Sequence, residues 1–540
     1  MKMNSKFHFI SFFMFLFWVG TVLVIPFFLW DEKKMLFEIE LLTLNSVMFS
    51  FVIFLDSVSL LFMSTVLIIS SLILIYAKDY MGKECHRFLW LTFLFMMFML
   101  IMIVSPSMVG VLLGWDGLGL ISFCLVIYYQ SPGSYNSGFI TAASNRVGDT
   151  MLVLSIIWAS TTGMFTFWEL CNGMSFFLIA CLTKSAQFPF SAWLPAAMAA
   201  PTPISSLVHS STLVTAGVYM MIRFYMSLLE SGMLSLLLFI SLLTILIAGL
   251  SALQEYDMKR LVALSTLGQL GFMVMIFSIG HIYICFLHLL IHALFKALLF
   301  MCTGVIIHGS LGIQDLRKMG SLMVNPLISV CLNISSFSLM GLPFTSGFYS
   351  KDSILELCLC GNGGLGLGLF MLLMAMITVS YSVRLFYYFS SLLGWVVWVG
   401  GSFYLSIPVV TLAMLNIIAG SCLNWLLLDV NLIYLSEVQK ALPLLMCMIG
   451  FCWCGQLWLS MSHTWLFSSL LYVSSLTKSM TTIIKWVFIF VKIMDQGWCE
   501  GLLGFNKKLI VLISFSLSGN SEGYMYLMSS GAGLMLMLFV

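Results

Sequence analysis

The stretch Phe93-Leu-Phe-Met-Met-Phe-Met-Leu-Ile-Met-Ile-Val104 is an unbroken apolar run. A strand of a membrane β-barrel would alternate apolar and polar residues, so this run favours a helix. Similar runs of about 20 residues recur along the whole chain, and a helix of that length spans the roughly 30 Å hydrocarbon core of a bilayer. Because backbone amides in lipid must be hydrogen-bonded internally, we expect these runs to be transmembrane helices.

The composition of the chain agrees with this interpretation. Of its 540 residues, 61% are hydrophobic and 8% are charged, whereas a soluble domain carries about 25% charged residues. The apolar runs predict an all-α, polytopic membrane protein of about 15 or 16 transmembrane helices. A net charge of +2 does not indicate a nucleic-acid partner. The apolar N-terminal stretch, residues 1–30, lacks a small-residue cleavage site, so we expect a retained helix and not a signal peptide.

The distribution of charge and proline along the chain predicts five segments. We expect N-terminal transmembrane helices over 1–105, a core over 106–390 that holds nearly all of the ionisable and proline-bearing features inside spans, additional transmembrane helices over 391–464, a lateral amphipathic helix over 465–515 and a C-terminal transmembrane anchor over 516–540.

The predicted lateral helix rests on three lysines. Lys478, Lys485 and Lys492 recur every seven residues and therefore share one helical face. A helix with one cationic stripe and a broad apolar remainder is typical of a position along the membrane surface or against other membrane subunits. An ordinary spanning helix with lysines near its ends is the alternative.

Several ionisable residues lie inside apolar runs, where each costs roughly 2.5–3.5 kcal/mol and by default marks a functional pathway. Asp116 needs a basic partner. Arg146 and Asp149 are three residues apart and can pair on one face, so a structural ion pair is as good an interpretation as proton handling. Desolvation favours the neutral amine of Lys184, which suits a proton relay; the alternative is a lysine that extends to the membrane interface.

Two segments predict interrupted helices. Prolines at the start of the span 201–223, which contains His209, weaken the backbone hydrogen-bond ladder, and Ser and Thr side chains can repair it. A second break is expected at Gly341-Leu-Pro343, just before Lys351 and Asp352. Interrupted helices of this kind commonly build ion sites in transporters.

The densest signal is His288, His292 and Lys296, which are spaced by four and therefore share one helical face. A row of two imidazoles followed by a lysine amine suits stepwise proton transfer, because histidine titrates near neutral pH. A metal or haem site is the competing interpretation, but no Glu or third His completes a zinc motif. The 14 cysteines form no C-x-x-C pair, so neither zinc nor an iron–sulfur cluster is predicted.

One glycine-rich motif resembles a dinucleotide-binding site, and we reject that interpretation. Gly361-Asn-Gly-Gly-Leu-Gly366 matches the dinucleotide-binding pattern, but it follows no strand and runs directly into an apolar helix. The sequence therefore predicts no nicotinamide or flavin site.

Several stretches resemble one family, the antiporter-like proton-pumping subunits, and most closely the distal pump of respiratory complex I. The resemblance is specific over about residues 50–390 and looser to the end, where that family has a long lateral helix. It rests on Lys184-Ser-Ala-Gln-Phe-Pro-Phe-Ser-Ala-Trp-Leu-Pro, Leu207-Val-His209, Asp257-Met-Lys259-Arg260, His288-Leu-Leu-Ile-His292-Ala-Leu-Phe-Lys296, Asp315-Leu-Arg317 and Gly347-Phe-Tyr-Ser-Lys351-Asp352.

The resemblance implies roles for matched positions. Asp116 and Lys184 would form the carboxylate–lysine pair of one half-channel, and Lys351 would be the exit lysine. His209, His288, His292 and Lys296 would form the central hydrated axis. The supporting residues would be Arg146, Asp149, Asp257, Lys259 and Asp352. Many family members have Glu at the position of Asp116, so the shorter side chain here makes a bridging water to Lys184 the expectation.

The resemblance also implies a setting and a mechanism. The chain would translocate protons in the mitochondrial inner membrane, beside a neighbouring antiporter-like subunit, while NADH, FMN, iron–sulfur clusters and ubiquinone bind other subunits of the NADH:ubiquinone reductase. Separating Asp116 from Lys184 would destabilise the charged lysine and release its proton. Three competing interpretations are a sodium/proton antiporter, which shares these motifs, a purely structural subunit and a haem-binding cytochrome.

Overall fold

The structure is a computed structural model of the 540-residue chain. It describes residues 2–30, 34–44, 47–82, 85–161, 166, 173–319, 326–360, 364–390, 403–427, 435–460 and a few positions between 485 and 494. The chain divides into two units, Met1–Leu471 and Tyr472–Val540. Nearly all of the described residues belong to the first unit.

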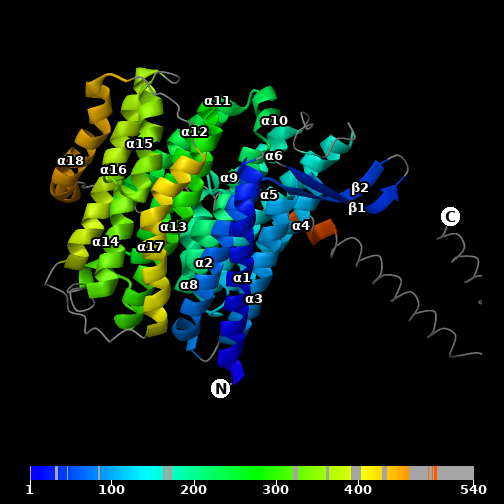
Figure 1. Ribbon diagram of the computed structural model, residues 1–540, viewed down its shortest axis with the longest axis horizontal. Helices are drawn as coiled ribbons and strands as arrows, with labels where there is room; N and C mark the ends of the chain where they lie inside the picture. The colour runs from blue at the N-terminus through cyan, green and yellow to red at the C-terminus, as the bar shows by residue number, and fades with distance from the viewer. Residues whose placement is uncertain are drawn as a thin grey trace, which may run out of the picture. The chain divides into compact units, whose positions relative to one another are not determined.

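Helices dominate the first unit, which confirms the predicted fold class (Figure 1). Its first half contains α1 (Lys2–Trp30), α2 (Ser57–Met81), α3 (Cys85–Val104), α4 (Met108–Val126), α5 (Pro132–Ser160), α6 (Met174–Lys184), α7 (Trp193–Ala196), α8 (Thr202–Ile204), the π-helical turn η4 (Ser205–Thr212), α9 (Leu213–Arg223) and α10 (Tyr225–Glu230). Short 3₁₀ turns flank α7 at Phe190–Ala192 (η2) and Ala197–Ala199 (η3).

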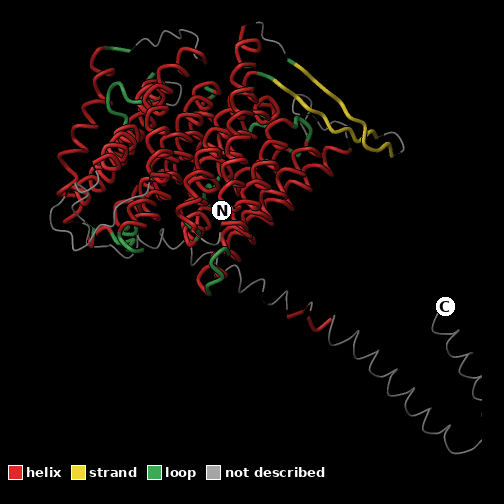
Figure 2. Tube along the Cα trace, turned by 60° about the horizontal axis from the view of Figure 1, so that its bottom comes forward, coloured by secondary structure: helices red, strands yellow, loops and turns green. Residues whose placement is uncertain are grey.

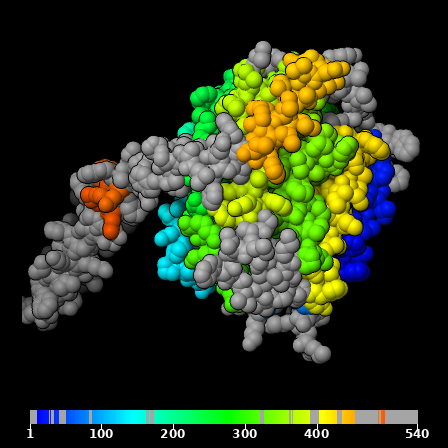
Figure 3. Space-filling model, turned by 90° about the vertical axis from the view of Figure 1, so that its left-hand side faces the viewer, coloured from blue at the N-terminus to red at the C-terminus, as the bar shows by residue number. Residues whose placement is uncertain are grey.

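The second half contains α11 (Leu234–Gln254), α12 (Met258–Ile279), α13 (Ile282–Gly309), α14 (Pro326–Met340), α15 (Ser346–Leu359), α16 (Leu365–Ser390), α17 (Phe403–Leu427) and α18 (Glu437–Ser460). A 3₁₀ turn, η5, covers Leu316–Lys318. By length and composition, 8 helices of the described residues can cross a membrane. Figure 3 shows α18 (orange) on the surface that faces the viewer, and it packs against α16.

The centre of the bundle is α13. The most apolar stretch of this helix is entirely buried, and that of its neighbour α12 is 94% buried. Helices α12, α14, α15 and α17 and the turn η4 all pack against α13. The ionisable side chains in the buried stretch of α13 are therefore surrounded by protein and not by lipid.

The structure adds a β-hairpin that the sequence analysis did not predict. Strands β1 (Met35–Leu44) and β2 (Val47–Leu55) pair antiparallel, with Glu38 opposite Val52, and they run out from the helical bundle (Figure 2). The run Phe37-Glu-Ile-Glu40 alternates apolar and acidic residues, which is a strand pattern. Three helices, α1, α2 and α3, lie within residues 1–105.

Both predicted helix interruptions are present. Between α8 and α9 the backbone forms the π-turn η4, where the Thr212 hydroxyl donates to the Leu207 carbonyl at 2.6 Å and the Ser210 hydroxyl to the Ser206 carbonyl at 2.6 Å. These side chains satisfy carbonyls that an ordinary α-helix would bond through its backbone. The second break separates α14 from α15, and Gly341 adopts a φ of +80° there, a conformation that favours glycine.

The predicted lateral helix over 465–515 lies outside the described residues, apart from a few positions near Lys485 and Lys492. The predicted anchor over 516–540 also lies outside them. Of the glycine-rich match at 361–366, Gly364 lies just before α16, and Leu365 and Gly366 begin that helix.

Candidate functional site

Asp116, Asp149 and Lys184 come from the neighbouring helices α4, α5 and α6. Lys184 is 1% exposed, and its Nζ donates to the Trp115 carbonyl at 3.3 Å. Glycine allows this approach: a Cβ at Gly119 would lie 3.3 Å from Lys184 Nζ. The ammonium is therefore held against the backbone of α4 in the middle of the protein.

Asp149 also approaches this ammonium, because the same Cβ at Gly119 would lie 4.0 Å from Asp149 Oδ2. No ion pair within 4.0 Å joins Lys184 to Asp116 in the described part of the chain. Instead, Asp149 Oδ2 lies 3.3 Å from Arg146 Nη1, and the Arg146 side chain is 52% exposed. Asp149 thus pairs with a surface guanidinium at the edge of this cluster.

The carboxylates of this cluster have free acceptor capacity. Asp116 Oδ1 and both oxygens of Asp149 are buried and accept no hydrogen bond from a described residue. Buried acceptors of this kind ordinarily bind water. The arrangement suits the expected water-mediated contact between Asp116 and Lys184.

A second group of ionisable residues lies along α13. His288, His292 and Lys296 are each at most 1% exposed, and the two imidazole centroids are 6.3 Å apart. Lys296 Nζ donates to the Ser265 hydroxyl of α12 at 2.6 Å. Their spacing by four places them in a row on one face, and that face lies inside the protein.

The two imidazoles have different surroundings. His288 Nε2 lies 3.1 Å from Gln269 Oε1 of α12, and its Nδ1 lies 2.8 Å from the Ser350 hydroxyl of α15. Neither nitrogen of His292 has a hydrogen-bond partner among the described residues. His288 is therefore fixed by protein groups, whereas His292 is available to water.

His209 lies in the π-turn η4, which packs against α13. Its side chain is 1% exposed and meets the Trp193 ring edge-on, with centroids 6.2 Å apart. Neither of its nitrogens has a described hydrogen-bond partner. The irregular backbone thus brings a buried imidazole up to the central helix.

Lys351 lies where the second interrupted helix restarts. Its Nζ donates to the Thr378 hydroxyl of α16 at 2.6 Å and to the Met340 and Leu339 carbonyls at 3.1 and 3.4 Å. These carbonyls end α14, so the partial negative charge of a helix C-terminus faces the ammonium. The break therefore supplies the acceptors that stabilise a buried lysine.

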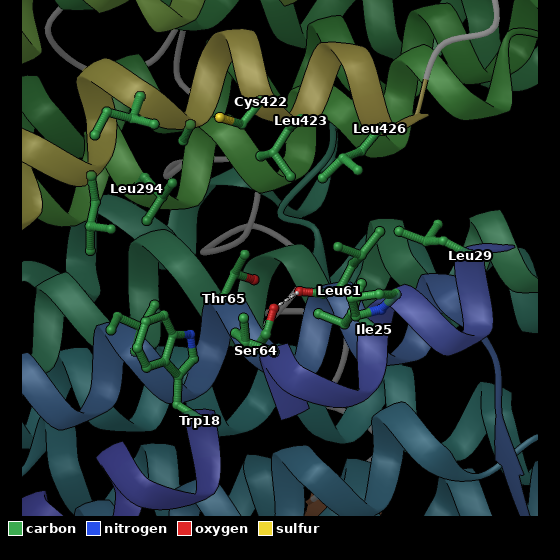
Figure 4. Close-up of a pocket in the computed structure, with 16 residues that line it drawn as sticks. Trp18, Ile25, Leu29, Leu61, Ser64, Thr65, Leu294, Cys422, Leu423 and Leu426 are labelled. Atoms are coloured by element: carbon green, nitrogen blue, oxygen red, sulfur yellow. Dashed lines mark hydrogen bonds between the residues drawn. The ribbon is translucent and has the colours of Figure 1, made fainter. Parts of the chain in front are cut away.

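A small cavity of about 160 Å³ adjoins this lysine and is also lined by Asp352 and by Cys447 of α18. A water molecule occupies roughly 30 Å³ in the liquid, so the cavity has room for a few of them. A larger cavity of about 900 Å³ lies among α1, α2, α13 and α17 (Figure 4). No carboxylate, amine or imidazole of the described residues lines the larger cavity, and it does not belong to the charged row.

Two of the residues predicted to support the site lie apart from it. Asp257 is paired with Arg260 at 3.5 Å near the start of α12, and its side chain is 42% exposed. Lys259 is buried, but its Nζ donates to the Ala200 carbonyl at 3.2 Å. Among the described residues, neither one bonds to the side chains of α13.

The sequence analysis assigned no role to the neutral residues that hold these groups, namely Ser265, Gln269, Ser350 and Thr378. Serine and threonine are common in membrane helices, so their types carry little signal. Gln269 carried a sequence signal that could have been used. It lies four residues after Ser265, so the two side chains share one helical face. The described residues contain no group of three His, Cys, Asp or Glu side chains that could hold a metal ion.

Comparison with known proteins gives matches over most of the chain. A family model described as NADH:quinone oxidoreductase/Mrp antiporter, TM matches residues 105–378, and one described as NADH-Ubiquinone oxidoreductase (complex I), chain 5 N-terminus matches residues 41–89. NADH-ubiquinone oxidoreductase chain 5 of Aedes aegypti is 40% identical, with 96% of each chain covered. The same protein of Locusta migratoria is 45% identical over 76% of this chain and 75% of that one.

Two solved structures share the fold. One is an Mrp complex from Dietzia sp., with a TM-score of 0.74 and 21% identity over 92% of this chain and 60% of that chain. The other is the membrane-bound sulfane sulfur reductase, an archaeal respiratory membrane complex, with a TM-score of 0.70 and 20% identity over 83% of this chain and 93% of that chain. At these identities the likeness establishes the architecture alone.

Proposed function

The chain belongs to the NADH-ubiquinone oxidoreductase chain 5 family, and from this premise we propose how its buried charges move protons. As a member of this family it is a proton-translocating membrane subunit of complex I, the proton-translocating NADH:ubiquinone reductase. Electron transfer from NADH to ubiquinone in other subunits drives the translocation. The route through this chain is the proposal.

Protons enter at the cluster of Asp116, Asp149 and Lys184, pass along the row on α13 and leave at Lys351 beside Asp352. His209 adds a further imidazole next to the row. The observation that carries this proposal is the position of His288, His292 and Lys296 on one face of the fully buried stretch of α13. Such residues are costly in a membrane protein and mark a pathway by default.

The driving step is electrostatic. A carboxylate near the Lys184 ammonium stabilises its charged form, and withdrawal of that carboxylate makes the lysine release its proton towards α13. Moving one charge against the membrane potential costs about 2.3 kcal/mol per 100 mV. The free energy of quinone reduction elsewhere in the complex supplies this work.

The setting is also part of the proposal. The chain works in the mitochondrial inner membrane and binds no cofactor, while NADH, FMN, iron–sulfur clusters and ubiquinone bind other subunits. The segment 465–515 runs along a neighbouring antiporter-like subunit, and 106–390 forms the translocating core. Crosslinks from Lys478 or Lys492 to a neighbouring membrane subunit of the isolated complex would support this contact. Crosslinks confined to this chain would contradict it.

Lys296→Met tests the route. The variant chain is assembled into the intact complex and reconstituted in liposomes, and protons translocated per electron are measured together with NADH oxidation. We expect a lower proton-to-electron ratio, because the row loses its only amine on α13 among the described residues. An unchanged ratio in a fully assembled complex would remove Lys296 from the route.

A further inference from the structure

His288 is held from both sides by neutral polar residues that lie outside the charged row. Gln269 Oε1 of α12 lies 3.1 Å from Nε2, and the Ser350 hydroxyl of α15 lies 2.8 Å from Nδ1. Gln269 and Ser350 are each at most 1% exposed. Three separate helices therefore meet at this one imidazole.

The two contacts distinguish the ring nitrogens. With the amide oxygen of Gln269 facing the ring, Nε2 must carry a hydrogen in order to donate to it. The NH₂ end of the same amide is buried and has no hydrogen-bond partner among the described residues. Nδ1 of the neutral ring is then the acceptor, and the Ser350 hydroxyl donates to it.

The same contacts remain favourable when the ring gains a proton. Both nitrogens of an imidazolium are donors, and the Gln269 carbonyl oxygen and the Ser350 hydroxyl oxygen can both accept. The released Ser350 hydroxyl hydrogen can turn towards the Gly347 carbonyl, 3.4 Å away. This stabilisation is needed because Lys351 and Lys296 place positive charge near His288.

We propose that Gln269 and Ser350 are positioning residues that keep Nε2 of His288 protonated, so that the transported proton is gained and lost only at Nδ1. Gaining it converts the neutral ring to imidazolium, and losing it restores the same neutral tautomer. No other bond forms or breaks. This inference rests on the proposed function, because it assumes that His288 lies on the proton route.

The test compares paired variants in the intact, reconstituted complex. Ser350→Ala removes the hydroxyl and Ser350→Thr keeps it; Gln269→Met removes the carbonyl acceptor at similar volume and Gln269→Glu keeps an acceptor. Ser70→Ala is the matched control, because Ser70 is an equally buried hydroxyl bonded only to the Leu67 carbonyl of its own helix. His288→Ala sets the scale of the effect.

We expect Ser350→Ala and Gln269→Met to lower the proton-to-electron ratio by at least half of the loss that His288→Ala causes. Ser350→Thr and Gln269→Glu should recover most of that loss, and Ser70→Ala should match the wild type. A purely structural role would not give recovery that follows the hydrogen-bonding group. Native gel electrophoresis of each variant verifies that the complex is assembled.

Two results would overturn the inference. If His288→Ala impairs translocation but Ser350→Ala and Gln269→Met do not, the positioning role is wrong and the proposed route stands. If Ser350→Thr is as impaired as Ser350→Ala, the hydroxyl is not the operative group. A wild-type ratio in His288→Ala would instead remove His288 from the route, and this inference with it.

Discussion

Lys184 is attracted by two carboxylates that differ in their own partners. Asp149 is already paired with Arg146 at 3.3 Å, whereas Asp116 has no ion pair among the described residues. The resemblance to the family assigned the main role to Asp116. In the structure, Asp149 is the carboxylate that lies near the ammonium at Gly119, where a Cβ would be 3.3 Å from Lys184 Nζ and 4.0 Å from Asp149 Oδ2.

This difference predicts an order of effects. Asp149→Asn should reduce proton translocation more than Asp116→Asn does, because it removes the carboxylate that lies beside Lys184 Nζ at Gly119. An interaction of about 1 kcal/mol changes the occupancy of the charged lysine roughly fivefold. The measurement is the proton-to-electron ratio of each assembled variant, and a larger loss in Asp116→Asn would show that Asp149 serves only its pair with Arg146.

The ionisable residues of the candidate site could be found from the sequence, because a charge inside an apolar run is rare and costly. Their partners could not. Ser350 and Thr378 are neutral, and most serine and threonine hydroxyls in such helices bond to their own backbone. Only the packing of α15 and α16 shows that these two contact His288 and Lys351.

At the scale of helices and strands, an ion pair far apart in sequence joins the start of α2 to the end of α9. Arg223 makes a two-pronged contact with Asp56, with Nη1–Oδ2 and Nη2–Oδ1 distances of 2.5 and 2.7 Å. Arg223 Nε also donates to the Tyr219 hydroxyl at 2.8 Å. Asp56 in turn caps α2 by accepting from the Ser59 amide at 2.9 Å.

Breaking this pair should destabilise the bundle. Removal of one partner of a buried ion pair typically costs about 3–5 kcal/mol, and both side chains are at most 13% exposed. Asp56→Asn should therefore lower the thermal stability and the yield of the assembled complex. The exposed Asp315–Arg317 pair is the control, since breaking such a pair costs about 1 kcal/mol or less. Equal losses in Asp56→Asn and Asp315→Asn would contradict the argument.

Glycine sets the spacing between α5 and α6. A Cβ at Gly148 would lie 2.1 Å from the Thr183 hydroxyl oxygen, next to Lys184, whereas one at Gly133 of the same helix meets nothing within 4 Å. Gly148→Ala should cost about 1–3 kcal/mol through overpacking and lower the proton-to-electron ratio, while Gly133→Ala should do neither. Thermal unfolding of the complex and the ratio measure both effects. If both variants unfold at the same temperature and give the same proton-to-electron ratio, the close spacing of α5 and α6 affects neither stability nor translocation.

The helix breaks were predictable because proline and glycine interrupt the backbone ladder at identifiable positions. The β-hairpin was not predicted, although Phe37-Glu-Ile-Glu40 carries the strand pattern. Its signal is short and lies between two long apolar helices, α1 and α2, so the helical period of its surroundings dominated.

For the whole molecule, hydrophobic content and the length of the apolar runs were sufficient to predict a helical membrane protein. They could not predict that α13 would be the innermost helix, because all the spans are similarly apolar. The burial of α13 follows from its packing against η4 and against α2, α8, α9, α12, α14, α15 and α17. Because α13 is innermost, the row of His288, His292 and Lys296 on one of its faces is shielded from lipid.

The central claim is that this row carries protons from Lys184 to Lys351. Its most direct test is the proton-to-electron ratio of the reconstituted complex containing Lys184→Met, measured beside NADH oxidation and a native gel for assembly. The account predicts normal assembly with a reduced ratio, because methionine fills a similar space but cannot hold a proton. A wild-type ratio in the fully assembled variant would contradict the role of Lys184 and the route that begins there.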